Sequence, residues 1–74
     1  MTLEALFAKV LRVPEDTLSD ASSPENVPGW DSLQGMYLLL AMQQAYGVAF
    51  TLEEVEGMVS LGDARRVLAA REVL

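Results

Sequence analysis

The 74-residue chain has 11 acidic and five basic residues, a net charge of −6, and neither cysteine nor histidine. This composition excludes a disulfide framework, a thiolate zinc site, and any catalytic group built on cysteine or histidine. The negative charge disfavours binding to nucleic acid or to an anionic membrane, because phosphate contacts dominate such binding. The charge either suits partners with basic docking surfaces or only keeps a small protein soluble, and composition leaves both readings open.

Length and hydropathy indicate one small domain over residues 1–74. The first ten residues have neither the basic segment nor the long apolar segment of a signal peptide. The longest apolar run, residues 36–42, is far shorter than the roughly 20 residues that a bilayer span needs. We therefore expect a monomeric cytoplasmic protein with no membrane span.

A first helix is predicted after Thr2, which is suited to cap its N-terminus. Pro14 disfavours helical geometry at Val13 and is expected to end this helix. Apolar residues in between follow the spacing of one helical face: Leu3, Leu6, Phe7, Val10 and Leu11.

Residues 14–31 are predicted to form a long loop, because they hold all three prolines and many Ser, Asp and Asn residues. A short helical turn is expected at its start. A loop of this length in a small domain is usually functional or held by its own side chains. The expected anchors are Leu18, Val27 and Trp30.

The second helix is predicted from Ser32 to about Tyr46, where Gly47 stops it. A short third helix follows in the segment TLEEVEGM, where Thr51 and Glu54 have capping-box spacing.

A fourth helix is predicted after Ser60, and Asp63 stands in the position that Glu or Gln takes in a capping box. Its inner face consists of Leu61, Ala64, Val67 and Leu68. There is no strand alternation and no internal repeat. The predicted fold class is therefore all-α: a small bundle of three main helices plus one short helix, with the long loop between the first and second helices.

The second helix has apolar residues on two opposite sides. One stripe is the expected core face, and its first residue, Gly35, should let a neighbouring backbone approach closely; the stripe comprises Gly35, Leu38, Leu39, Met42, Ala45 and Tyr46. The opposite side, here called the outer patch, comprises Leu33, Met36, Tyr37 and Leu40, with Gln44 among them and Ser32 and Gln43 at its flanks. Either the outer patch is an exposed interaction site or the helix is buried all round.

Ser32 follows Asp31 directly at the predicted start of the second helix. A Ser-His-Asp triad is impossible without histidine, and nothing places Lys9, the only lysine, near Ser32. With Asp31 as N-cap, the free backbone N–H groups and the helix dipole favour a phosphate at Ser32. The residues thus suggest either a serine modified by another enzyme or an ordinary Asp-Ser helix start.

The segment GWDSLQGMYLLLAMQQAYGVAFTLEEV resembles acyl and peptidyl carrier proteins. It has the Asp-Ser-Leu signature of Asp31, Ser32 and Leu33, the long helix after it, an aromatic-Gly turn, the apolar Phe50 and a short acidic helix. The upstream stretch RVPEDTLSDASS resembles the loop of that family, so the likeness covers essentially the whole chain.

The resemblance implies that Ser32 carries a 4′-phosphopantetheine arm, with Asp31 and Leu33 as flanking motif residues. A separate Mg²⁺-dependent phosphopantetheinyl transferase would attach the arm from coenzyme A. An acyl or aminoacyl cargo then rides as a thioester and is presented to a cargo-loading ligase or acyltransferase and to downstream enzymes. The resemblance also implies that the chain is not an enzyme, holds no metal of its own, and is docked by partners at Met36, Tyr37 and Leu40.

The second helix departs from the fatty-acid type of carrier, because residues 32–46 contain no charged residue where acids are usual. Trp30 before Asp-Ser is more like free-standing carriers of secondary metabolism or of D-alanine transfer. We therefore favour a polyketide, nonribosomal peptide or amino-acyl transfer pathway. The alternative function is a helical protein-interaction module that binds a partner through the outer patch without modification.

Overall fold

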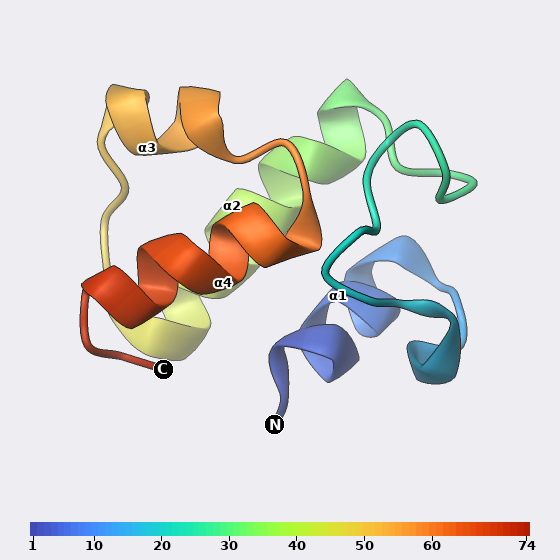
Figure 1. The fold of residues 1–74 in the computed structure, drawn as a ribbon, viewed down its shortest axis with the longest axis horizontal. Coiled ribbons are helices and arrows are strands. Elements are labelled where there is room, and N and C mark those ends of the chain that lie inside the picture. The colour runs from blue at the N-terminus through green and yellow to red at the C-terminus, as the bar shows by residue number, and fades with distance from the viewer.

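The computed structural model describes all residues 1–74 and is entirely helical outside its loops. In chain order the elements are α1 (Leu3–Leu11), the 3-10 turn η1 (Glu15–Thr17), α2 (Ser32–Tyr46), α3 (Leu52–Gly57) and α4 (Leu61–Ala70). Helix α1 packs against both α2 and α4, and α3 lies at the edge of the molecule away from α1 (Figure 1). The predicted all-α fold with a long loop between the first two main helices is confirmed.

Local capping explains where the helices begin. The Oγ1 atom of Thr2 accepts a hydrogen bond from the backbone N–H of Ala5 at 3.0 Å, at the start of α1. The predicted capping box of α3 is present, because Thr51 and Glu54 each accept from the other's backbone N–H. At α4 the Ser60 side chain caps the helix as expected.

The end of α1 differs from the expected one. The helix stops at Leu11, because Arg12 takes a left-handed backbone conformation with φ of 58° and donates its N–H to the carbonyl of Ala8. Pro14 therefore follows a helix that has already ended. Gly47 ends α2 in the same left-handed way, as predicted.

The core joins three helices and the long loop. Its eleven buried apolar residues come from α1, the loop, α2 and α4: Leu3, Leu6, Phe7, Leu11, Leu18, Val27, Leu38, Met42, Leu61, Ala64 and Leu68. Trp30 is half-buried and packs edge-on against Phe7, with ring centroids 5.6 Å apart and an interplanar angle of 76°. The three expected loop anchors, Leu18, Val27 and Trp30, are thus confirmed.

The core stripe of α2 is narrower than predicted. Leu38 and Met42 are buried, and Leu39 and Tyr46 are partly buried against the core, whereas Ala45 is exposed. No neighbouring backbone lies close to Gly35, contrary to the prediction. A Cβ placed there would have only the Nε1 atom of Trp30 within 4 Å, at 3.8 Å. The close approach occurs at Gly62 instead, where a Cβ would lie 2.9 Å from both the Cβ and the carbonyl oxygen of Asp20.

Alanine substitutions at these two glycines should have opposite effects on stability. Gly62→Ala should destabilise the fold by about 1–3 kcal/mol, because the new methyl overlaps the Asp20 backbone. Gly35→Ala meets only ordinary contact distances and should stabilise α2 by about 0.5–1 kcal/mol through higher helix propensity. Urea unfolding of the two variants measures the difference, and equal midpoints would contradict it.

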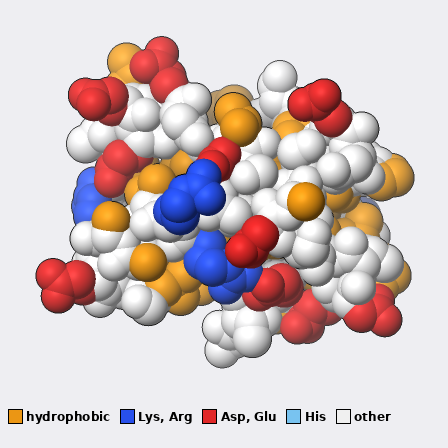
Figure 2. Space-filling model, viewed as in Figure 1, with side chains coloured by type: hydrophobic (Ala, Val, Ile, Leu, Met, Phe, Trp, Pro, Cys, Tyr) orange, Lys and Arg blue, Asp and Glu red, His pale blue; other side chains and the backbone are white.

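Ion pairs fasten the long loop and α1 to α4. The Nε atom of Arg65 donates to Asp20 at 3.0 Å, and an Nη atom of the same guanidinium pairs with Glu4. The hydrogen bond to Asp20 raises the pKa of Arg65 above its ordinary value. Figure 2 shows the basic side chains of this face lying against acidic ones. None of the helices has the length and apolar character required to cross a bilayer.

Candidate functional site

Ser32 is the first residue of α2 and its side chain is exposed. The residue before it, Asp31, is the N-cap, and its Oδ1 atom accepts from the N–H of Gln34 at 2.9 Å. The Asp31 carbonyl accepts from the N–H of Gly35 at 2.9 Å, which begins the helical ladder. No side chain of the protein hydrogen-bonds to the Ser32 hydroxyl, so this oxygen is free to react in solvent.

The start of α2 is suited to an anion at Ser32. The N–H groups of Ser32 and Leu33 precede the intrahelical ladder, and the dipole of this 15-residue helix has its positive end here. Asp31 uses one carboxylate oxygen for its cap. The geometry therefore fits a phosphate ester on the serine oxygen.

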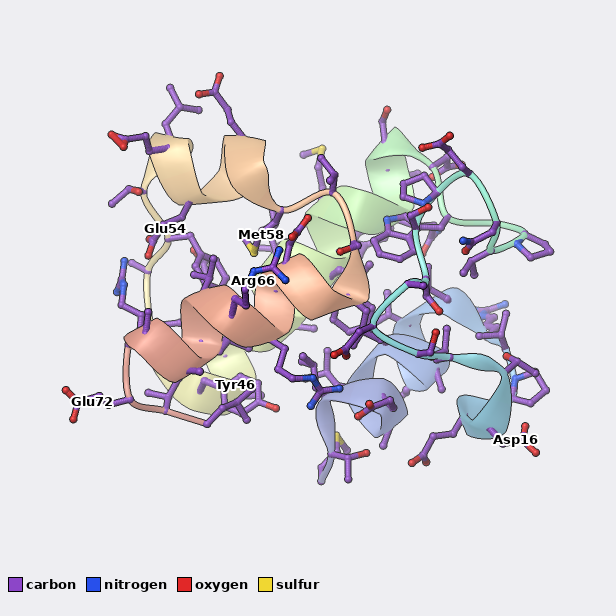
Figure 3. All side chains as sticks on the ribbon, in the orientation of Figure 1. Asp16, Tyr46, Glu54, Met58, Arg66 and Glu72 are labelled. Carbon is purple, nitrogen blue, oxygen red and sulfur yellow. The ribbon has the colours of Figure 1, made fainter.

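An apolar cavity of about 250 Å³ opens beside Ser32. Residues of all four α-helices line it or flank it, among them Phe7, Leu39, Met42, Val55 and Met58. Figure 3 shows Met58 in the space between α3 and α4. The start of α2 is thus suited to a phosphate on the exposed serine, and the adjoining cavity has room for a thin apolar group.

The outer patch of α2 is exposed. Leu33, Met36, Tyr37 and Leu40 have 54%, 61%, 49% and 52% of their surface accessible. The reading in which α2 is buried all round is therefore wrong, because no other element covers this side. Met36 lies in both the outer patch and the wall of the cavity, so the two features adjoin at the start of α2.

Gln43, expected at the flank of the outer patch, has a structural role. Its side chain is half-buried, and its Oε1 atom accepts from the N–H of Phe50 at 3.1 Å. This bond ties the end of α2 to the segment that leads into α3.

No residue of α3 is fully buried, and an ion pair and hydrogen bonds join the helix and the segment before it to the end of α4. The Nε atom of Arg71, beyond the end of α4, donates to Glu54 at 2.9 Å, and an Nη atom donates to the Ala49 carbonyl at 2.9 Å. Glu54 is on the side of α3 that faces α4 (Figure 3). Sequence reasoning found the capping role of Glu54 but not its ion pair with Arg71, which joins residues 17 positions apart.

Acid should loosen α3. The hydrogen bond from Arg71 holds the pKa of Glu54 below its ordinary value of 4.5. A depressed carboxyl pKa contributes stability that is present above that ordinary value and is lost as the pH falls through the lower pKa of the folded protein. Below about pH 4.5 the amide signals of α3 should shift in NMR spectra before the core unfolds. Arg71→Gln removes this hydrogen bond, so the pKa of Glu54 and the midpoint of the amide-shift titration should rise toward the ordinary value. An unchanged midpoint in that variant would contradict the assignment.

Ten of the twelve residues that line the cavity were not predicted as site residues, among them Phe7, Val55 and Met58, whereas Ser32 and Met36 were. Phe7 was expected only as core, and a periodic apolar pattern does not distinguish a core residue from a cavity wall. No local signal marks Val55 or Met58, because their place depends on how α3 sits over α2 and α4.

Ser32, the residues that line the cavity and the outer patch all fall within the segment that matches one family model. A family model described as "Phosphopantetheine attachment site" matches residues 2–67, which run from the cap of α1 into α4. Members of this family have 4′-phosphopantetheine attached covalently. The chain therefore belongs to the phosphopantetheine-binding family of acyl and peptidyl carrier proteins.

Proposed function

We propose that Ser32 is the attachment residue for 4′-phosphopantetheine and that residues 1–74 act as a single carrier domain. The observation that supports this most directly is the exposed, unbonded hydroxyl of Ser32 at the start of α2, beside the apolar cavity. The arm would hold an acyl or aminoacyl cargo as a thioester on its terminal thiol. The chain supplies the site, the docking surface and the shape, and no catalytic group.

The absence of a base near Ser32 supports a modification carried out by a separate enzyme. The chain has no histidine, and Lys9 lines a different groove together with Gly29 and Gln34. During attachment the Ser32 oxygen forms a bond to phosphorus, its proton passes to a base of the transferase, and the nucleotide part of coenzyme A leaves. The protein needs only to present the oxygen and to stabilise the phosphate that results.

Asp31 and Leu33 flank the attachment site with different roles. The free carboxylate oxygen of Asp31 is exposed beside Ser32, where it can help the transferase hold Mg²⁺ or orient the hydroxyl. Leu33 is more than half exposed and extends the outer patch up to the modified residue. An enzyme that reaches Ser32 therefore meets Leu33 at once.

We propose the outer patch as the docking surface for the transferase, the cargo-loading ligase or acyltransferase, and the downstream enzymes. An exposed apolar area next to a reactive residue is a usual feature of interaction sites. Since α2 has no charged residue, recognition should depend on apolar contact more than on charge. This supports a polyketide, nonribosomal peptide or amino-acyl transfer pathway over fatty-acid synthesis.

The test is the intact mass of the protein after incubation with coenzyme A, Mg²⁺ and a broad-specificity phosphopantetheinyl transferase. The expected result is the gain of one phosphopantetheine group, located on the peptide that contains Ser32. A mass that stays unchanged with several transferases would overturn the proposal and favour the alternative, a helical interaction module that binds a partner without modification.

Substitutions in the outer patch should weaken docking without unfolding the protein. Met36→Glu or Leu40→Glu should raise the KM of the transferase about tenfold, because each removes apolar contact and adds a charge that must be desolvated. The control is Leu52→Glu, which changes a residue that is 74% exposed on α3, outside the patch. Equal KM values for all three variants would contradict the assignment of the patch, and circular dichroism checks that each remains helical.

A further inference from the structure

A second groove runs along the seam between α1 and α2, separate from the cavity at Ser32. It consists of two adjoining hollows that share Lys9 and Val10. The hollow nearer the start of α2 is completed by Arg12, Gly29, Gln34 and Tyr37, and the other one by Leu6, Ala41, Gln44 and Ala45. The lining therefore combines apolar side chains from both helices with the cationic Lys9 and Arg12 at the end of α1 and the neutral polar Gln34 and Gln44 of α2.

The charges in this groove are unlike those of the rest of the protein. Three of the five basic side chains, Arg65, Arg66 and Arg71, are engaged in ion pairs with acids. The other two, Lys9 and Arg12, are exposed and have no acidic partner, and both line the groove. No acidic residue lines either hollow, although the chain has 11 of them.

The position of Lys9 and Arg12 at the C-terminal end of α1 favours cations through the helix dipole. That effect explains why basic residues are tolerated there, but it places no requirement on the neighbouring surface of α2. The helix dipole of α1 does not explain why the facing polar side chains of α2 are all uncharged, and these are Gln34, Tyr37 and Gln44. Together the two features leave a positive strip that nothing within the protein neutralises.

We propose that the α1–α2 groove binds an amphipathic acidic segment of a partner enzyme. Carboxylates of this segment pair with Lys9 and Arg12, and its apolar side chains pack against Val10, Ala41 and Ala45. The inference rests on the proposed function only in taking the partner to be an enzyme that acts on the group at Ser32.

The groove should select one orientation of a partner that docks on the outer patch. Tyr37 belongs to both surfaces, so a partner seated on the outer patch reaches the groove without a gap. On the other side of α2, α3 exposes the acids Glu53 and Glu56. A partner with carboxylates on the α1 side is thus attracted in one orientation and repelled in the reverse one.

The test uses the ¹⁵N-labelled protein of residues 1–74, with and without the arm, and a short helical peptide built from Glu, Ala and Leu. We expect amide shifts concentrated at residues 9–12 and 29–37 with this peptide, and none with a matched peptide in which Lys replaces Glu. The double variant Lys9→Glu/Arg12→Glu should bind the acidic peptide at least about tenfold more weakly. Peptide binding is measured on unmodified protein as well. A failure to attach the arm at Ser32 is therefore distinguishable from a failure of the peptide to bind the groove.

The control is Arg66→Glu combined with Arg71→Glu, which makes the same change of net charge outside the groove. This control should retain binding of the acidic peptide within about twofold, the scale of a screened long-range charge effect. Equal loss in both double variants would reduce the effect to net charge and overturn the proposal. Shifts produced equally by inorganic phosphate would show a small-anion site only, and no shift with the acidic peptide at millimolar concentration would also overturn it.

Discussion

Alanine in place of Ser32 should abolish phosphopantetheine attachment completely while leaving the protein folded. The substitution removes the only hydroxyl group at the start of α2, so the transferase has no acceptor there. The cap of α2 belongs to Asp31, whose bond to Gln34 does not involve the Ser32 hydroxyl. Intact mass spectrometry measures attachment, and circular dichroism measures the fold.

The matched control for this prediction is Ser23→Ala, which removes a serine hydroxyl from the long loop. Its hydroxyl accepts only a local bond from Glu25 at 3.3 Å, so this variant should fold and gain the same mass as the wild type. If Ser32→Ala were still modified, another residue would be the attachment site. If it failed to fold, the loss of modification would say nothing about chemistry, and Ser32→Gly would then be measured in its place.

Phe7→Ala should produce the largest loss of stability. Phe7 is 1% exposed, packs edge-on against Trp30, and forms part of the wall of the cavity at Ser32. Removal of a buried phenyl ring destabilises a fold by about 3–5 kcal/mol through lost transfer free energy and the void that remains. A domain of this size has a total of roughly 4–11 kcal/mol, so this substitution should remove a large share of the free energy of unfolding.

Urea unfolding monitored by Trp30 fluorescence measures this loss, because the Phe7–Trp30 contact reports directly on the core. The control is Tyr37→Ala, which removes an aromatic ring that is 49% exposed on α2 and should change the free energy of unfolding much less. Phe7→Leu should fall between the two. Equal unfolding midpoints for Phe7→Ala and Tyr37→Ala would contradict the packing described for α1.

The same packing couples stability to the site. Trp30 precedes Asp31 and Ser32 in the chain, and its contact with Phe7 anchors the end of the long loop on α1. The start of α2 is therefore positioned by a buried aromatic contact, while the Ser32 hydroxyl remains in solvent. We expect Phe7→Leu, which keeps an apolar side chain there, to remain a substrate for the transferase.

The sequence by itself determined the number, order and starts of the helices. Capping bonds join residues three positions apart, as at Thr2, Asp31, Thr51 and Ser60, so local pattern contains all the necessary information. It also indicated the outer patch, because apolar residues on both sides of α2 exceed what so small a bundle can bury. The family assignment followed from Asp-Ser-Leu on this helix plan and is confirmed by the match over residues 2–67.

Only the tertiary structure decided which residues meet across the chain. The close backbone approach lies at Gly62 and not at Gly35, because it depends on where the loop around Asp20 crosses α4. The pairing of Glu54 with Arg71 and the freedom of Lys9 and Arg12 depend likewise on the distances between elements. Helical periodicity predicts which face of a helix a residue occupies. The residue that it meets on a neighbouring element depends on how the helices pack, and local sequence spacing does not determine that packing.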